Sequence, residues 1–219
     1  MFENMMKNEI VIIDYGIGNI KSVEQAFSEV GARTIVSSDL KIIRNASKIV
    51  LPGVGAFENA MNAICDLNLS ETIVKLANNG VPLLGICLGM QLLFDASDEF
   101  GVTKGLGLIP GRVQSYPLAK ANTEEIRVPQ INWHELIPSS NITNWENTLL
   151  SNLNYDDAVY FVHSYVANPA NKSHRIAEYK CGGNLINAVV VKDNITGCQF
   201  HPEKSGLPGL NILRNFINQ

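Results

Sequence analysis

The sequence predicts an α/β fold in which a mostly parallel central sheet is flanked by helices and joined by a small antiparallel element. Between residues 9 and 86, short apolar runs typical of buried strands alternate with stretches of helical spacing. Strands that alternate with helices form parallel sheets covered on both faces. From about residue 105 to residue 191, short strands separated by glycine, proline and asparagine turns predict the antiparallel element.

The clearest elements lie in the first half of the chain. Two stretches of helical spacing end at Gly31 and Gly80, and glycine commonly closes a helix. In order, the sequence predicts a strand at 9–14, a helix at 19–30, strands at 33–37 and 48–51, helices at 56–65 and 70–79, and a strand at 81–86. A returning strand at 197–200 and a closing helix at 207–217 complete the fold.

The composition predicts one globular domain spanning residues 1–219. Hydrophobic residues make up 46% of the chain and charged residues 17%, and the formal charge of −4 gives no footprint for nucleic acid or anionic membranes. No apolar stretch approaches transmembrane length, and the N-terminus lacks the basic and apolar regions of a signal peptide. Four cysteines without framework spacing favour a reduced, cytoplasmic setting.

A thiol lies between two glycines in residues 85–89, Gly-Ile-Cys-Leu-Gly. This pentapeptide follows an apolar strand and precedes an apolar-periodic stretch, predicted as helix, that reaches Phe94. Strand, sharp turn and helix form a nucleophile elbow, here with Cys87 in place of serine. The helix N-terminus would favour the thiolate. Taken alone, the pentapeptide fits a buried structural cysteine about equally well.

A second segment supplies the groups that a thiol nucleophile needs. Residues 196–203 read as a short strand that ends in His201-Pro202-Glu203. A nucleophile requires a base, and the base requires an acceptor that fixes its tautomer. The order Cys87, His201, Glu203 on an α/β pattern therefore predicts a catalytic triad.

Six ordered motifs resemble the class I, triad-type glutamine amidotransferases. The resemblance runs from about residue 10 to residue 216 and is closest to the family of glutaminase subunits of imidazole glycerol phosphate synthase. The motifs lie at residues 13–19, 51–57, 85–94, 105–111, 160–165 and 199–206. The resemblance implies the flavodoxin-like fold of that class and hydrolysis of L-glutamine to glutamate and ammonia, with no cofactor and no metal.

The resemblance also implies roles for further residues. An oxyanion hole would form from the Gly53–Val54 loop and the amide of Leu88. The side-chain amide of Gln91 would recognise the substrate glutamine, and Ser164 and Tyr165 would bind the amino-acid end of the substrate. His163 is interpreted as structural and is kept out of the triad.

The partner implied by the resemblance is a cyclase subunit with a (β/α)8 barrel, which forms a heterodimer with the glutaminase. It would use the ammonia to make imidazole glycerol phosphate and aminoimidazole carboxamide ribotide in histidine biosynthesis. Trp133 and Lys204 are predicted at this interface. The family typically has Val-Pro-His-Met-Gly-Trp-Asn at residues 128–134, and this chain departs from it most clearly at Gln130, Asn132 and His134.

Those departures leave open an alternative, a related glutaminase that supplies ammonia to a surface-sugar amidotransferase. A catalytically silent binding subunit and a cysteine peptidase are weaker alternatives, because the triad is intact and Gln91 and the Gly53 loop are present. Two other motif readings fail on spacing. Lys21 stands where a dinucleotide fingerprint needs its third glycine, and no Pro-Cys-x-x-Cys follows His201 as in zinc deaminases.

Overall fold

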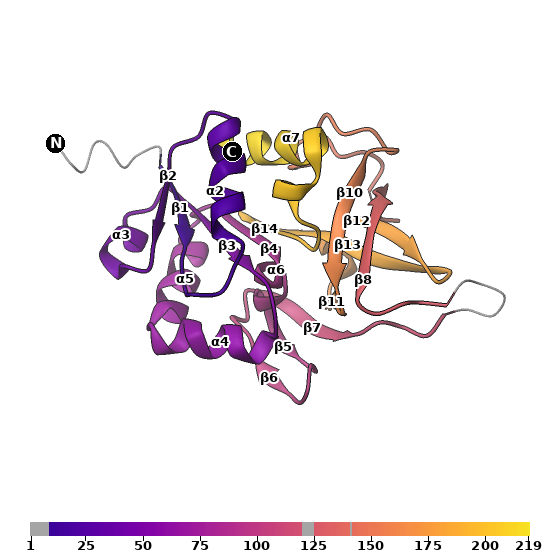
Figure 1. The fold of residues 1–219 in the computed structure, drawn as a ribbon, viewed down its shortest axis with the longest axis horizontal. Helices are drawn as coiled ribbons and strands as arrows, with labels where there is room; N and C mark the ends of the chain where they lie inside the picture. Colours follow the sequence, from indigo (N-terminus) through magenta and orange to yellow (C-terminus); the bar gives the residue numbers. More distant parts are fainter. Residues whose placement is uncertain (1–8, 120–124, 141) are drawn as a thin grey trace.

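The computed structural model describes residues 9–119, 125–140 and 142–219, and its main feature is an eight-stranded sheet (Figure 1). The strand order is β2–β1–β3–β4–β14–β13–β12–β9. From β2 to β14 the strands pair in parallel, and β13, β12 and β9 continue the sheet antiparallel. The bounds are β1 (Ile10–Ile13), β2 (Thr34–Ser37), β3 (Lys48–Gly53), β4 (Leu83–Cys87), β9 (Ile137–Pro138), β12 (Arg175–Cys181), β13 (Asn184–Lys192) and β14 (Ile195–Cys198).

Helices cover both faces of the parallel part of the sheet, as the sequence predicts. Because successive strand residues point to opposite faces, Ile10 and Ile12 join one hydrophobic cluster while Val11 and Ile13 join the other. The first cluster contains α2 (Ile20–Glu29) and α7 (Gly206–Ile217), and the second contains α3 (Leu40–Arg44), α4 (Phe57–Asp66) and α5 (Leu69–Asn78). In the described residues, no helix combines the length and apolar character needed to cross a membrane.

Two helices differ from the prediction. The helix after Cys87, α6 (Leu88–Leu92), is short, and Phe94 begins strand β5 (Phe94–Ser97) instead of ending a helix. The carbonyls of residues 92–94 accept hydrogen bonds from the amides of residues 106–109, so the helix cannot continue. Helix α3 was not predicted, because its five residues are too few to show a period.

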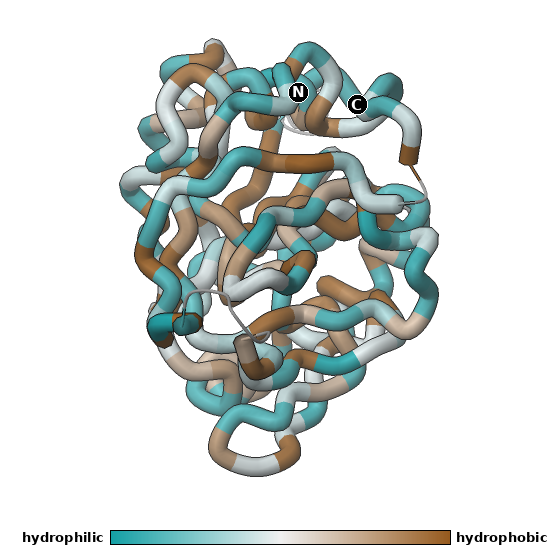
Figure 2. The backbone as a smooth tube through the Cα atoms, turned by 90° about the vertical axis from the view of Figure 1, so that its right-hand side faces the viewer, coloured by the Kyte–Doolittle hydropathy of each residue, from teal (hydrophilic) through white to brown (hydrophobic). Residues whose placement is uncertain are grey.

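The antiparallel part is larger than the predicted small element. Besides β13, β12 and β9, it contains a pair formed by β8 (Gln130–Glu135) and β10 (Ala158–His163), in which Trp133 lies opposite Tyr160. A further sheet has the strand order β11–β7–β5–β6, in which β11 spans Tyr165–Pro169, β7 spans Ile109–Ser115 and β6 spans Thr103–Lys104. Figure 2 views the molecule from this side and shows hydrophobic and hydrophilic positions alternating along the chain.

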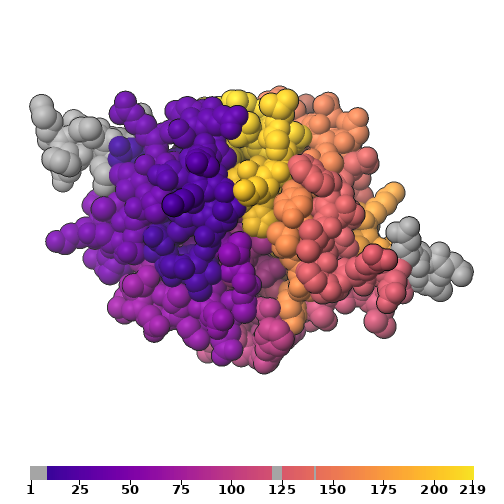
Figure 3. Space-filling view, viewed as in Figure 1, coloured from indigo at the N-terminus to yellow at the C-terminus, as the bar shows by residue number. Residues whose placement is uncertain are grey.

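The fold brings three sequence motifs to one edge of the sheet. Strands β3, β4 and β14 are neighbours and run parallel, so their carboxyl ends lie together. These strands end at Gly53, at Cys87 and at Cys198, shortly before His201. The C-terminal segment lies between the N-terminal half and the antiparallel part (Figure 3). The parallel sheet therefore gathers the residues that the sequence predicts as catalytic.

Candidate active site

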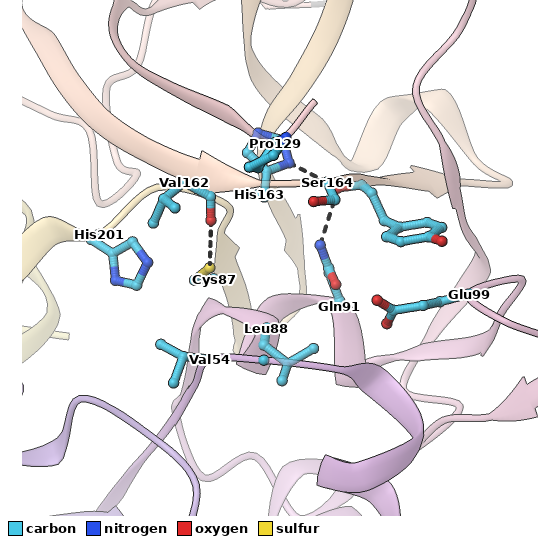
Figure 4. Close-up of a pocket in the computed structure, with 12 residues that line it drawn as sticks. Val54, Cys87, Leu88, Gln91, Glu99, Pro129, Val162, His163, Ser164 and His201 are labelled. Atoms are coloured by element: carbon cyan, nitrogen blue, oxygen red, sulfur yellow. Dashed lines mark hydrogen bonds between the residues drawn. The ribbon is translucent and has the colours of Figure 1, made fainter. Parts of the chain in front are cut away.

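A cavity of about 420 Å³ lies at this edge of the sheet. Figure 4 shows His201 and Glu99 on opposite sides of the cavity, with Cys87 and Gln91 between them. Cavities of this size hold small-molecule ligands. Of the predicted site residues, those that line it are Val54, Cys87, Leu88, Gln91, Ser164, Tyr165 and His201.

Cys87 occupies the turn between β4 and α6. Its backbone has φ of 54° and ψ of −112°, a conformation that is unfavourable for any residue with a side chain. Two glycines hold the turn by close packing: a Cβ on Gly85 would lie 2.8 Å from the carbonyl oxygen of Gly89, and a Cβ on Gly89 would lie 1.7 Å from that of Leu51. The thiol is 3.7 Å from the Val162 carbonyl oxygen and faces the cavity (Figure 4).

His201 is oriented by a buried carboxylate. Its Nδ1 lies 2.7 Å from Oε1 of Glu203, whose side chain has no exposed surface. Because the carboxylate accepts, Nδ1 carries the proton, and Nε2 has no hydrogen-bond partner within the described residues. Asn19 Nδ2 also donates to this Glu203 oxygen, at 3.4 Å. This arrangement leaves Nε2 available for proton transfer.

The charges around His201 favour its protonated form. Burial alone would lower the pKa of His201, but the Cys87 thiol group and the Glu203 carboxylate outweigh burial and raise the pKa to about 10. A cationic imidazole beside a thiolate is the pairing that activates cysteine nucleophiles. Cys87 and His201 therefore have the electrostatic relation of a nucleophile and its base.

The loop that carries His201 is fixed to strand β10. The His201 amide donates to the Tyr160 carbonyl at 2.9 Å. Ser205 Oγ donates to the His201 carbonyl at 2.7 Å and accepts from the Tyr160 amide at 3.0 Å. The antiparallel part thus positions the base, although the base itself follows a parallel strand.

The predicted oxyanion residues do not all face the cavity. Val54 and Leu88 line it, and Leu88 begins α6, so its amide lies at a helix start. Gly53 is behind them: a Cβ there would lie 2.5 Å from the Tyr15 hydroxyl and 3.0 Å from Leu88 Cβ. Gly53 therefore permits close packing because it has no side chain, while Val54 and the following Gly55 line the cavity.

Gln91 and Tyr165 are connected on the cavity wall. Gln91 Nε2 donates to the Tyr165 carbonyl at 3.1 Å and to Gln199 Oε1 at 3.0 Å. These two bonds fix the amide group of a side chain that is only 5% exposed. The segment at Ser164 and Tyr165 lies beside it.

His163 also lines the cavity, but its ring is fully engaged by other groups. Its Nδ1 lies 2.8 Å from the Tyr165 carbonyl and donates to it. Its Nε2 therefore faces the hydroxyls of Tyr116 and Tyr179, at 2.8 and 2.9 Å, as an acceptor. Burial lowers the pKa of His163 to about 4. A neutral imidazole with both nitrogens engaged fits the structural role predicted for it.

Glu99 is a cavity residue that the sequence reasoning missed. Its Oε2 accepts from the Phe57 amide at 2.7 Å, at the start of α4, and its carboxylate faces the cavity opposite His201 (Figure 4). The segment 98–100 reads as a charged surface turn, so no local pattern marks Glu99. The fold places this carboxylate on the cavity wall, where it could pair with a cationic group of a ligand.

The two predicted interface residues lie on the surface. Trp133 is 51% exposed, and its ring packs against Tyr160 with centroids 5.7 Å apart. Lys204 is exposed and donates to Ser22 Oγ at 3.1 Å. Asn132 is exposed, and its Oδ1 accepts from the amide of Trp133.

The other two departures from the family motif make contacts inside the chain. Gln130 Nε2 lies 3.2 Å from Cys181 Sγ, and Gln130 Oε1 lies 3.3 Å from His134 Nε2. The His134 ring stacks on Tyr179 at 4.5 Å. Both residues are half-buried, and their side chains contact other residues of this chain.

Comparison with protein families identifies one family model that matches most of the chain. The family model described as "Glutamine amidotransferase class-I" matches residues 11–219.

The described residues contain no group of three or more His, Cys, Asp or Glu side chains that could hold a metal ion.

Curated relatives match nearly the whole chain. "Imidazole glycerol phosphate synthase subunit HisH 1" of Legionella pneumophila (strain Lens) is 44% identical, covering 96% of this chain and 99% of that protein. "Imidazole glycerol phosphate synthase subunit HisH" of Prochlorococcus marinus (strain NATL2A) is 41% identical, with 96% of each covered.

Solved structures share the fold at low sequence identity. The structure entitled "Crystal structure of glutamine amidotransferase" has a TM-score of 0.70 at 15% identity and covers 95% of this chain and 99% of that chain. "Structure of PurLQS from Thermotoga maritima" also has a TM-score of 0.70, at 18% identity, with 97% and 99% covered.

Proposed function

The chain belongs to the class-I glutamine amidotransferase family, and from this premise we propose that it is the glutaminase subunit of an imidazole glycerol phosphate synthase in histidine biosynthesis. It is a glutamine-hydrolysing enzyme subunit that acts as a single domain. The observation that carries the proposal is the buried Cys87 thiol on its strained turn, beside a His201 imidazole that is bonded to Glu203.

The geometry supports a thioester mechanism. Cys87 Sγ attacks the side-chain amide carbon of glutamine, and His201 Nε2 takes the thiol proton and passes it to the departing nitrogen. The C–N bond breaks and ammonia leaves. Water then gives a proton to His201 and cleaves the thioester, which releases glutamate and returns a proton to Cys87. Throughout, Glu203 holds the tautomer that keeps Nε2 facing the reaction.

The other cavity residues stabilise the oxyanion and bind the substrate. The Val54 and Leu88 amides stabilise the oxyanion that forms on the amide oxygen. The side-chain amide of Gln91 recognises the substrate glutamine. Ser164 and Tyr165 bind the amino-acid end, and the Glu99 carboxylate pairs with its ammonium group. The position of Glu99 opposite His201 supports this orientation.

The proposed partner is a cyclase subunit with a (β/α)8 barrel, which receives unprotonated ammonia and forms a heterodimer with this chain. Trp133 is a half-exposed aromatic of the kind that anchors interfaces, and Lys204 lies three residues beyond the base. Gln130 and His134 have contacts inside the chain and give no support to the surface-sugar alternative.

The first test removes the nucleophile. Cys87→Ala should abolish glutamine hydrolysis, because no other group on the cavity wall can form the thioester, while the fold and partner binding are kept. Synthesis driven by added ammonium salts should persist in the complex. Cys65→Ala, at an exposed free thiol, is the matched control and should hydrolyse glutamine normally. Glutaminase activity in Cys87→Ala would refute the assignment.

The second test addresses the partner. A glycine-rich loop changes its orientation at small energetic cost. Loss of ~4 kcal/mol of oxyanion stabilisation by such a change corresponds to roughly a thousandfold in rate. The isolated chain should therefore hydrolyse glutamine slowly, and a cyclase partner should accelerate it by orders of magnitude. Steady-state assays with and without the partner measure this. Equal turnover in both would contradict the coupling.

A further inference from the structure

Tyr15 follows β1 and lies directly behind the oxyanion loop. Its side chain is 2% exposed, and its hydroxyl donates to the Pro52 carbonyl at 2.7 Å. We propose that this hydroxyl is a positioning group: it fixes the last peptide of β3 so that the next amide, that of Val54, is directed at the developing oxyanion. This inference rests on the proposed glutaminase function and deepens it.

The position of the hydroxyl within the sheet supports this role. Strand β3 lies between β1 and β4, and Gly53 is opposite Cys87 in the β3–β4 register. Tyr15 holds the Pro52 carbonyl from the β1 side. Because β3 ends at Gly53, the peptide that joins Gly53 to Val54 is the first one outside the strand. The hydrogen bond therefore marks the boundary between fixed strand and catalytic loop.

The Tyr15 hydroxyl also constrains the loop in a second way, because it packs closely against Gly53. A Cβ on Gly53 would lie 2.5 Å from the Tyr15 oxygen, 3.0 Å from Leu88 Cβ and 3.1 Å from the Gly89 amide nitrogen. The hydroxyl thus occupies the space beside the Gly53 Cα, whose ψ angle sets the direction of the Val54 amide. Both proposed oxyanion donors, Val54 and Leu88, are adjacent to residues in this packed group.

The hydroxyl also stays a donor when the thiol ionises. Burial, and then the negative charge of Cys87, raise the pKa of Tyr15 well above its usual value. A group that keeps its proton next to a thiolate maintains the same hydrogen bond through the catalytic cycle. This property suits a donor that must hold one peptide in one orientation.

Removing the hydroxyl should loosen the loop without changing the residues that bind the substrate. In Tyr15→Phe the ring remains, and the Pro52 carbonyl loses the hydrogen bond from the hydroxyl. We expect kcat for glutamine hydrolysis to fall about tenfold, equivalent to ~1.4 kcal/mol of transition-state stabilisation. The KM for glutamine should change less than about twofold, because the hydroxyl does not line the cavity.

The decisive experiment compares two reactions of the same thiol in the full chain bound to its cyclase partner. Glutamine hydrolysis passes through an oxyanion, whereas alkylation of Cys87 by iodoacetamide does not. Alkylation is followed on the Cys87 peptide by mass spectrometry, because the exposed Cys65 thiol also reacts, and both rates are expressed per folded chain. Tyr155→Phe is the matched control, since the Tyr155 hydroxyl also donates to a backbone carbonyl, that of Thr143, at 3.4 Å.

Tyr15→Phe should slow hydrolysis about tenfold and leave alkylation unchanged, while Tyr155→Phe should leave both unchanged. Wild-type hydrolysis in Tyr15→Phe would overturn the inference. So would an equal loss in both reactions, because it would mean that the thiol or the triad had been disturbed. These outcomes differ from failure of the proposed function, which would appear as glutamine hydrolysis by Cys87→Ala.

Discussion

The parallel and antiparallel parts of the sheet contribute to the active site in different ways. On the parallel side, backbone packing holds the reacting group: Cys87 is fixed by the approach of Gly89 to Leu51. On the antiparallel side, side chains hold the binding wall, as His163 does with Tyr116. The comparison teaches that the position of the Cys87 thiol depends on backbone packing, whereas the cavity wall at His163 depends on polar side chains that respond to pH and substitution.

The most damaging change should be to the carboxylate that follows β14. Glu203→Gln keeps the shape of the side chain but loses its charge, so kcat should fall about a thousandfold, or ~4 kcal/mol. The pKa of His201, now about 10, should fall as well, which the pH profile of Cys87 alkylation measures. Glu58→Gln, exposed on α4, is the control. An unchanged kcat would remove Glu203 from the triad.

The parallel side should also be intolerant of one added methyl group. Alanine is the better helix former by about 1 kcal/mol, but a Cβ on Gly89 would lie 1.7 Å from a backbone oxygen that cannot move aside. We expect Gly89→Ala to lower the free energy of unfolding by about 3 kcal/mol. Urea denaturation measures this. A stabilised variant would show that backbone packing does not constrain the elbow.

On the antiparallel side, the expected effect is one of pH. The pKa of His163 is lowered from its ordinary 6.5 to about 4, so the unfolded chain binds more protons between these values. Its contribution to stability is complete above about pH 6.5 and is lost as the pH falls toward 4. Between pH 7 and pH 5 this loss is about 2 kcal/mol.

His163→Asn keeps a donor for the Tyr165 carbonyl but has no titrating ring. The variant should therefore be less stable than the wild type at pH 7, and the difference should shrink by about 2 kcal/mol at pH 5. Chemical denaturation of both proteins across this range tests the prediction. Parallel curves would mean that His163 does not titrate with folding.

The smallest effect on the free chain is expected at Trp133. The ring is half-exposed, so Trp133→Ala should cost less than about 1 kcal/mol in stability while weakening partner binding about tenfold or uncoupling hydrolysis from synthesis. Calorimetry and titration with the cyclase subunit separate the two. A large loss of stability with coupling unchanged would show that Trp133 serves only to pack on Tyr160.

Local patterns are sufficient to predict most of the parallel side, although not the five-residue helix α3. Both helix-closing glycines, Gly31 and Gly80, have the positive φ angles that such an end requires. The strand–turn–helix around Cys87 was identified because its signals lie within about ten residues of each other. The end of α6 was missed because it depends on bonds from residues 106–109 to the carbonyls of 92–94, which no local pattern records.

The antiparallel side and part of the site depend on contacts between distant residues. Glu99 and Tyr15 carry no local sign of their positions, since one faces the cavity from a surface turn and the other reaches Pro52 across strands. From the sequence alone, the departures at Gln130 and His134 put the identity of the partner in doubt. Their contacts with Cys181 and Tyr179 show that their neighbours are internal.

The central claim is that the turn after β4 carries the nucleophile, and the most direct test is to trap the covalent intermediate. The chain, with its cyclase partner, is quenched in acid during glutamine turnover and analysed by intact-mass and peptide mass spectrometry. The account predicts one glutamyl group attached to Cys87, and none in Cys87→Ala. A glutamyl group on another residue, or steady hydrolysis by Cys87→Ala, would contradict it.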